Sequence, residues 1–235
     1  MLIMRTIDLI RRLESYPTFS PAIFRSLTGY DPAYSKVRLH RLLKAGYISR
    51  LQRNVYTVHR DPFLVASRIV WPSYISLWSA LHFHGLTEQV PSEISVLTTR
   101  IKSRTVVNFM HSRIVFRNIP PHHFFGFSKV RQGDFDIFVA EPEKALLDAV
   151  LLEDISLSEI YSILKSSSAS LSLERLVDYV QRAGEEEATR RFGWMLESLG
   201  LRKLRRVRFR REIPLDYARP PEGRLDRRWG VIVNL

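Results

Sequence analysis

The residues that most resemble a catalytic motif lie between positions 126 and 136. Gly126 and Ser128 precede Asp134 and Asp136, which are two positions apart in the predicted strand region. Nucleotidyl-transferring enzymes use a Gly-Ser turn and two such carboxylates to hold a triphosphate and its metal ions. Here a phenylalanine separates the glycine from the serine, and Asp134 follows a glycine in a pattern typical of a hairpin turn. We therefore expect no catalytic residues here.

A second charged group opens a helix expected from Glu141-Pro142 to Glu153. Acidic side chains at a helix N-terminus are stabilised by the helix dipole, and Glu143 is placed to cap the helix. Between Lys144 and Asp148 the chain reads Ala-Leu-Leu, which indicates a packed face. No base or nucleophile accompanies these carboxylates, so we interpret the group as structural and the protein as not an enzyme.

The histidines do not form a recognisable metal motif. His82 and His84 are two residues apart and do not share a helical face. His122 and His123 are adjacent in an expected loop, with no third ligand at a familiar spacing. The chain has no cysteine, which excludes thiolate zinc sites and disulfides. The sequence predicts no metal site and no cofactor.

The basic residues indicate a function more clearly. The 235-residue chain has a net charge of +12, and residues 1–60 hold 11 Lys and Arg against three Asp and Glu. Arginine supplies 29 of the 36 basic residues, and its guanidinium binds phosphates and guanine edges through paired hydrogen bonds. A solvated basic surface is the alternative, but the concentration in one short region favours double-stranded DNA as the partner.

The elements that would position these arginines follow from capping signals. A helix is expected over Thr6–Ser15, and Ser20-Pro21 and Asp31-Pro32 each pair an N-cap residue with a first-turn proline. The two helices that they open end near Gly29 and Gly46. Two short strands follow and meet in a turn at Asn54. Three helices and a hairpin predict a winged helix-turn-helix over residues 1–60.

The helix expected from Pro32 to Ala45 has two distinct faces. At 100° per residue, one face should be buried; it comprises Ser35, Leu39, Leu42 and Leu43. The other face contains no acid. We expect base contacts from Tyr34, Val37, His40 and Arg41. Phosphate contacts are expected from Lys36, Arg38 and Lys44. The hairpin should add backbone or minor-groove contacts from Arg50 and Arg53.

The rest of the chain predicts a mixed α/β domain over residues 61–235, so that the whole is α+β. Helices are expected at 63–70, 73–84, 141–153, 156–166, 172–182 and 185–199. Strands are expected at 94–98, 105–109, 114–118, 124–130, 135–140, 207–213 and 229–234.

The expected strand near residue 207 belongs to a basic segment, with seven Lys and Arg among residues 202–211. Arg206, Arg208 and Arg210 alternate with apolar residues, which would place the three arginines on one side of a strand. They form a candidate second basic surface, for phosphates or for an acidic partner. The alternative is a solvated edge strand protected from aggregation by its charge.

Several sequence segments occur in a characteristic order: LLKAGYISRLQRNVYTV (42–58), YISLWSALHFHGLTEQ (74–89), VAEPEKALLDAV (139–150), RFGWMLESLGL (191–201) and WGVIVN (229–234). In their order and spacing they resemble the AbiEi-type antitoxins and related bacterial and archaeal transcriptional regulators. One departure is Asn54, where the family usually has glycine; asparagine tolerates the same backbone. The resemblance implies an N-terminal winged helix that represses its own operon, and a C-terminal domain that counters a nucleotidyltransferase-like toxin without requiring direct contact.

We expect a cytoplasmic protein, because Met1-Leu2-Ile3-Met4-Arg5 lacks a signal-peptide pattern and no apolar run has membrane-spanning length. Three other functions stay open from the sequence. They are a nucleotidyltransferase-like or nuclease enzyme tethered to DNA, an interaction module for RNA or an acidic protein, and a regulator with no toxin partner. The operator, the oligomeric state and the partner's identity do not follow from the residues.

Overall fold

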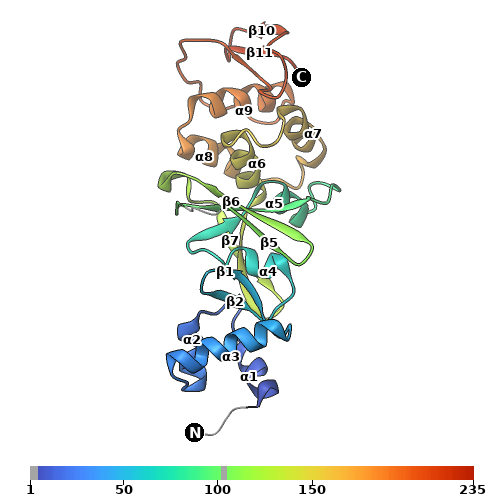
Figure 1. Ribbon diagram of the computed structural model, residues 1–235. Coiled ribbons are helices and arrows are strands. Elements are labelled where there is room, and N and C mark those ends of the chain that lie inside the picture. The colour runs from blue at the N-terminus through green and yellow to red at the C-terminus, as the bar shows by residue number, and fades with distance from the viewer. Residues whose placement is uncertain (1–4, 102–104) are drawn as a thin grey trace. The chain divides into compact units, whose positions relative to one another are not determined.

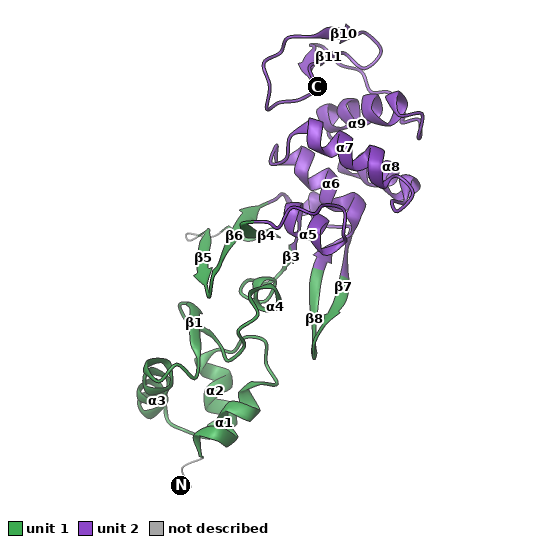
Figure 2. Ribbon diagram, turned by 90° about the vertical axis from the view of Figure 1, so that its right-hand side faces the viewer, with its two compact units in different colours: residues 1–74, 92–118, 129–138 green, residues 75–91, 119–128, 139–235 purple. Residues whose placement is uncertain are grey.

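A computed structural model describes residues 5–101 and 105–235; the chain start examined for a leader, Met1–Met4, lies outside these ranges. The predicted α+β class is confirmed. Two compact units are present (Figure 2): residues 1–74, 92–118 and 129–138, and residues 75–91, 119–128 and 139–235. Residues 1–60 fall within the first unit, and a domain boundary near residue 60 stays a prediction.

The N-terminal elements match the expected order (Figure 1). They are α1 (Thr6–Leu13), α2 (Pro21–Thr28), α3 (Pro32–Lys44), β1 (Ser49–Gln52) and β2 (Val55–Thr57). Both predicted caps are present: the Ser20 hydroxyl accepts from the Ile23 amide at 3.3 Å, and the Asp31 carboxylate accepts from the Tyr34 amide at 2.9 Å. Each cap satisfies an amide that the helix leaves unpaired, which fixes where α2 and α3 begin.

These elements share a core of their own. It consists of Leu9, Leu13, Phe19, Phe24, Tyr30, Leu39, Leu42 and Ile48. Phe19, in the loop between α1 and α2, exchanges two backbone hydrogen bonds with Tyr56 of β2, at 2.8 and 2.9 Å. The hairpin is therefore tied to the helices by both backbone pairing and side-chain burial.

One predicted core residue of α3 is wrong. Leu43 is 36% exposed, whereas Leu42 is 2% exposed. The buried residues of α3 are Ser35, Leu39 and Leu42, a narrow stripe at positions i, i+4 and i+7. At 100° per residue Leu43 lies on the flank of this stripe, so it misses the contact with α1 and α2.

A six-stranded mixed sheet follows, in the order β5-β6-β4-β3-β8-β7. Its strands are β3 (Ser73–Ile75), β4 (Glu93–Thr98), β5 (Val106–Phe109), β6 (Ser112–Asn118), β7 (Phe127–Gln132) and β8 (Phe135–Ala140). β4 and β6 are parallel, from Glu93 opposite Arg113 to Thr98 opposite Asn118, and β5 is antiparallel to β6. The helix α4 (Pro62–Ala66) precedes the sheet and is shorter than predicted.

The predicted helix over 73–84 is wrong in its first part. Residues 73–75 form β3, and the helix α5 begins only at Leu77 and ends at Phe83. All three residues of β3 are buried, and the strand lies between β4 and β8 in the sheet. A short strand buried on both faces has no alternation of polar and apolar residues, so its sequence does not distinguish it from a helix.

The second unit contains a helical layer (Figure 2). Its elements are α5, the 3₁₀ turn η1 (Pro121–His123), α6 (Pro142–Leu151), α7 (Leu157–Ser167), α8 (Leu173–Ala183) and α9 (Glu186–Ser198). The four predicted helices from residue 141 onward are confirmed within three residues at each end. Helix α6 packs against α5, α8 and α9, and every residue from Glu143 to Val150 is buried.

Burial of α6 forces its charged residues into pairs. The Lys144 ammonium contacts the Asp148 carboxylate one turn later, and the Ser76 hydroxyl donates to the other Asp148 oxygen at 2.7 Å. Burial lowers the pKa of Lys144, and the attraction of Asp148 opposes that shift. Glu143 accepts from the Ser172 amide at 2.6 Å. The charges of this helix thus join it to the start of α5 and the start of α8.

The C-terminal segment differs from the prediction. Residues 207–212 form no strand, and the three-stranded sheet there has the order β10-β11-β9, with β9 at Ile213–Pro214, β10 at Arg224–Asp226 and β11 at Val231–Val233. The buried Arg190 explains this. Its guanidinium donates to the Arg211 carbonyl at 2.9 Å and the Trp229 carbonyl at 2.8 Å, and lies 4.4 Å from the Phe209 ring. The Arg190 side chain thus binds a segment for which the alternation of residues had predicted strand pairing.

No helix in the described ranges combines the length and the apolar character needed to cross a bilayer.

We expect Asp148→Ala to destabilise the protein by about 3–5 kcal/mol, because Lys144 would lose its carboxylate in a buried site. The matched control is Glu174→Ala, which removes the partner of Arg202 from an exposed pair and should cost no more than about 0.5 kcal/mol. Urea unfolding of both full-length variants measures the difference. Equal losses would contradict the assigned role of the buried pair.

We also expect Leu42→Ala to cost about 2–5 kcal/mol, because it leaves a cavity in the N-terminal core. Leu43→Ala should change stability by less than about 1 kcal/mol, since its side chain already contacts solvent. The two neighbouring variants differ only in which side of α3 they probe. A larger loss for Leu43→Ala in urea unfolding would mean that α3 is rotated.

Candidate nucleic-acid interface

The exposed face of α3 contains most of the residues predicted to contact DNA. The exposed residues among them are Lys36, Val37, His40, Arg41 and Lys44. No acidic residue occurs in α3, and Asp31 is its N-cap residue. An α-helix is about 10–12 Å wide with its side chains and fits a major groove about 12 Å wide. Within residues 5–101 and 105–235, no ion pair engages Lys36, Arg41 or Lys44, so α3 presents a cationic face of suitable width.

Two of the predicted contacts are turned toward the protein. Arg38 is half-buried and donates from Nη2 to the Thr6 hydroxyl of α1 at 2.7 Å. Tyr34 is half-buried, and its ring packs edge-on against Tyr30 at 4.8 Å between centroids. Arg38 therefore helps to hold α3 on α1, and Tyr34 lies at the edge of the exposed face, where the sequence placed it.

The β1–β2 hairpin carries the remaining predicted residues. Arg50 and Arg53 are both exposed, and Arg50 Nε donates to the Gln52 carbonyl at 3.4 Å. Asn54 has φ of +60° at the turn, the left-handed conformation that was expected. Tyr47, which was not among the predicted contacts, is 52% exposed between α3 and β1.

The residues between 126 and 136 that were compared with a nucleotidyltransferase site make structural contacts. Asp136 pairs with Lys129 at 2.7 Å and with Arg131 at 3.7 Å, and the hydrogen bond from Lys129 lowers its pKa. Asp134 lies in the predicted turn between β7 and β8. A Cβ at Gly126 would come within 2.9 Å of the Tyr179 ring, so this glycine permits close packing.

The second basic surface is present without its strand. Arg206, Arg208 and Arg210 are exposed, and Val207 and Phe209 between them are half-buried. The alternation of exposed arginines and less exposed apolar residues is therefore as predicted. Arg208 and Arg210 also reach a cleft in the second unit.

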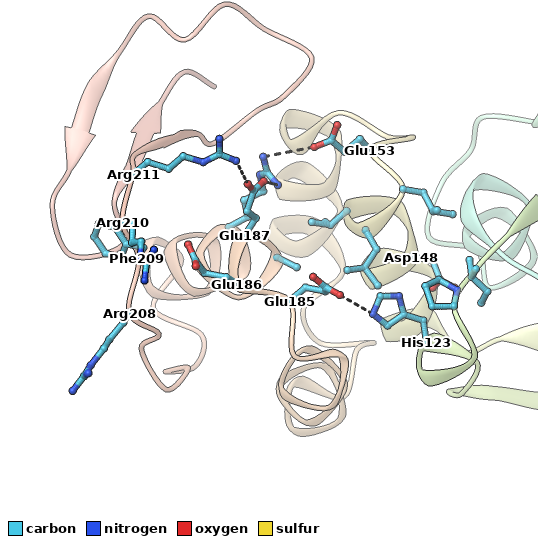
Figure 3. A pocket seen from close by; sticks show the side chains of 17 residues that line it. His123, Asp148, Glu153, Glu185, Glu186, Glu187, Arg208, Phe209, Arg210 and Arg211 are labelled. Atoms are coloured by element: carbon cyan, nitrogen blue, oxygen red, sulfur yellow. Dashed lines mark hydrogen bonds and ion pairs between the residues drawn. The ribbon is translucent and has the colours of Figure 1, made fainter.

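This cleft has a volume of about 1090 Å³ and lies between the end of α6, η1, the start of α9 and the segment 208–211 (Figure 3). Its charges are mixed: Arg211 pairs with Glu187 at 3.2 Å, and Arg191 pairs with Glu187 at 3.1 Å. His123 lies on its wall, and burial together with neighbouring His122 lowers its pKa. The cleft therefore presents both acidic and basic side chains, some of them paired with each other.

No family model and no curated protein sequence matches the chain. Among solved structures, the crystal structure of the RV2827C protein from Mycobacterium tuberculosis is similar, with a TM-score of 0.66 and 13% sequence identity. The similarity covers 97% of this chain and 89% of that one. At this identity the likeness concerns the fold alone: nearly the whole chain shares its mixed α+β arrangement with a crystallised protein.

Proposed function

We propose that residues 1–60 form a winged helix-turn-helix that binds double-stranded DNA, and that the protein is a transcriptional repressor. The observation that carries the proposal is the outward face of α3, which is basic, free of acids and fixed by a separate core. A solvated surface helix would not need a basic hairpin beside it. Such a protein acts on DNA in the cytoplasm.

The roles of the side chains follow from their positions. Arg41, in the middle of the exposed face, is assigned to a guanine edge, and Val37, which is 46% exposed, to a thymine methyl. His40 and Tyr34 complete the base-reading set. Phosphate contacts are assigned to Lys36, Lys44, Arg50 and Arg53. Arg38 is assigned to positioning α3 through Thr6, in place of the phosphate contact expected from sequence.

The resemblance to AbiEi-type antitoxins supports a more specific proposal. The protein would repress the promoter of its own operon and counter a nucleotidyltransferase-like toxin encoded beside it. The domain predicted over residues 61–235 would supply the antitoxin activity, with or without direct contact to the toxin. A regulator without a toxin would share the DNA-binding face, so the two activities need separate tests.

Arg41→Ala should weaken binding to the true operator by about 1–3 kcal/mol and binding to a scrambled duplex far less, because only the cognate site loses a base contact. Lys44→Ala, one turn away on the same face, is the matched control. It should weaken both duplexes similarly and reduce the slope of log affinity against log salt by about one. Titrations of fluorescent duplexes at several salt concentrations measure both effects. If Arg41→Ala weakens binding to both duplexes equally, Arg41 does not contact a base and its assignment is wrong.

The antitoxin proposal predicts that inducing the adjacent nucleotidyltransferase-like gene alone stops bacterial growth, and that co-expressing this chain restores it. The Arg41→Ala variant should still restore growth while losing repression of a promoter reporter, because the two activities reside in different parts of the chain. Growth curves and reporter activity from the same strains give both readings. A functional toxin that this chain fails to counter would leave a repressor without antitoxin activity.

A further inference from the structure

The structure brings together three residues that the sequence keeps apart. His122 and His123 end the 3₁₀ turn η1, and Glu185 is the N-cap residue of α9, 62 positions after His123. The Nε2 atoms of His123 and His122 lie 3.2 and 3.9 Å from the same Glu185 carboxylate oxygen. The three ligand atoms all lie within 4.8 Å of one another.

The environment of His123 sets this cluster apart from an ordinary surface contact. Its side chain is only 9% exposed, and its Nε2 atom is buried without a hydrogen bond of good geometry to any described residue. A buried polar atom left in this state costs free energy unless another group satisfies it. The Glu185 carboxylate, for its part, makes no capping hydrogen bond to α9. The Nε2 atom of His123 and the Glu185 carboxylate therefore lie close together without a hydrogen bond of good geometry between them.

We propose that His122, His123 and Glu185 bind a divalent transition-metal ion, with Zn²⁺ the best match. Two imidazoles and one carboxylate are a common zinc ligand set, with bonds of about 2.0–2.2 Å. Tetrahedral bonds of that length place ligand atoms about 3.3 Å apart. The His123–Glu185 distance already fits, and the Nε2 atom of the exposed His122 lies 3.9 Å from the same carboxylate oxygen, so only a small shift is needed. Hard ions such as Mg²⁺ and Ca²⁺ prefer all-oxygen sites and fit this set poorly.

Three protein ligands leave one coordination position of the metal open. His123 and Glu185 both line the cleft, and Figure 3 shows Glu185 directed at His123 on its wall. A water or an anionic ligand in the fourth position would therefore reach the cleft, on whose wall Arg208 and Arg210 also lie. Metal binding would also join η1 to the start of α9. This inference is independent of DNA binding by α3.

The test is calorimetric titration of tag-free, metal-stripped full-length protein with Zn²⁺ alone, followed by Co²⁺ absorption spectra. We expect one ion per chain and visible bands typical of four- or five-coordinate Co²⁺. His122→Ala and Glu185→Gln should each weaken Zn²⁺ binding at least tenfold; both residues are exposed, so these variants should fold. His82→Ala, which removes an exposed histidine elsewhere in the same unit, should bind like the parent.

A parent protein that binds no stoichiometric Zn²⁺ overturns the proposal. So does a His122→Ala or a Glu185→Gln variant that keeps the parent affinity. Far-ultraviolet circular dichroism of each metal-free variant checks that lost binding does not reflect lost folding. His123→Ala is not needed for the decision, since its buried ring also contributes to packing.

Discussion

The second unit depends on one constraint: α6 is buried on every side, so each of its charged side chains must find a partner inside the protein. Lys144 and Asp148 pair with each other one turn apart. The Ser76 hydroxyl donates to the second Asp148 oxygen, and the Ser172 amide donates to one Glu143 oxygen. A charge in such surroundings is tolerated only when it is paired and hydrogen-bonded. The positions of α5 and α8 around α6 are therefore fixed by electrostatics as well as by apolar packing.

Local signals in the sequence were enough to predict most of the elements. Ser20-Pro21 and Asp31-Pro32 specify helix starts through atoms only three residues away, and such contacts do not depend on the rest of the fold. The predictions failed where distant residues decide the outcome. β3 is a strand because other strands flank it, and the segment before Ile213 is no strand because Arg190 binds its backbone. The strands that flank β3, and Arg190, are distant in sequence from the segments they affect, so local patterns do not indicate them.

The candidate sites divide in the same way. The exposed face of α3 could be predicted because helical periodicity alone separates it from the buried stripe, although Leu43 shows that the edge of a stripe is uncertain by one residue. The inward turn of Arg38 could not be predicted, since it depends on where α1 places Thr6. The cluster of His122, His123 and Glu185 lay beyond sequence reasoning for the same reason: no spacing rule connects residues 62 positions apart.

The way in which the segment 202–212 is fixed has an evolutionary consequence. A strand in a ladder is held by its own backbone, so selection acts on the pattern of its side chains. Here Arg190 of a separate helix donates a hydrogen bond to the Arg211 carbonyl, and the Phe209 ring packs against the Arg190 guanidinium. Selection for folding should therefore act on Arg190 and Phe209, while Arg206, Arg208 and Arg210 remain free to diverge. Substitutions that change the charge of this segment should therefore leave the fold unaltered.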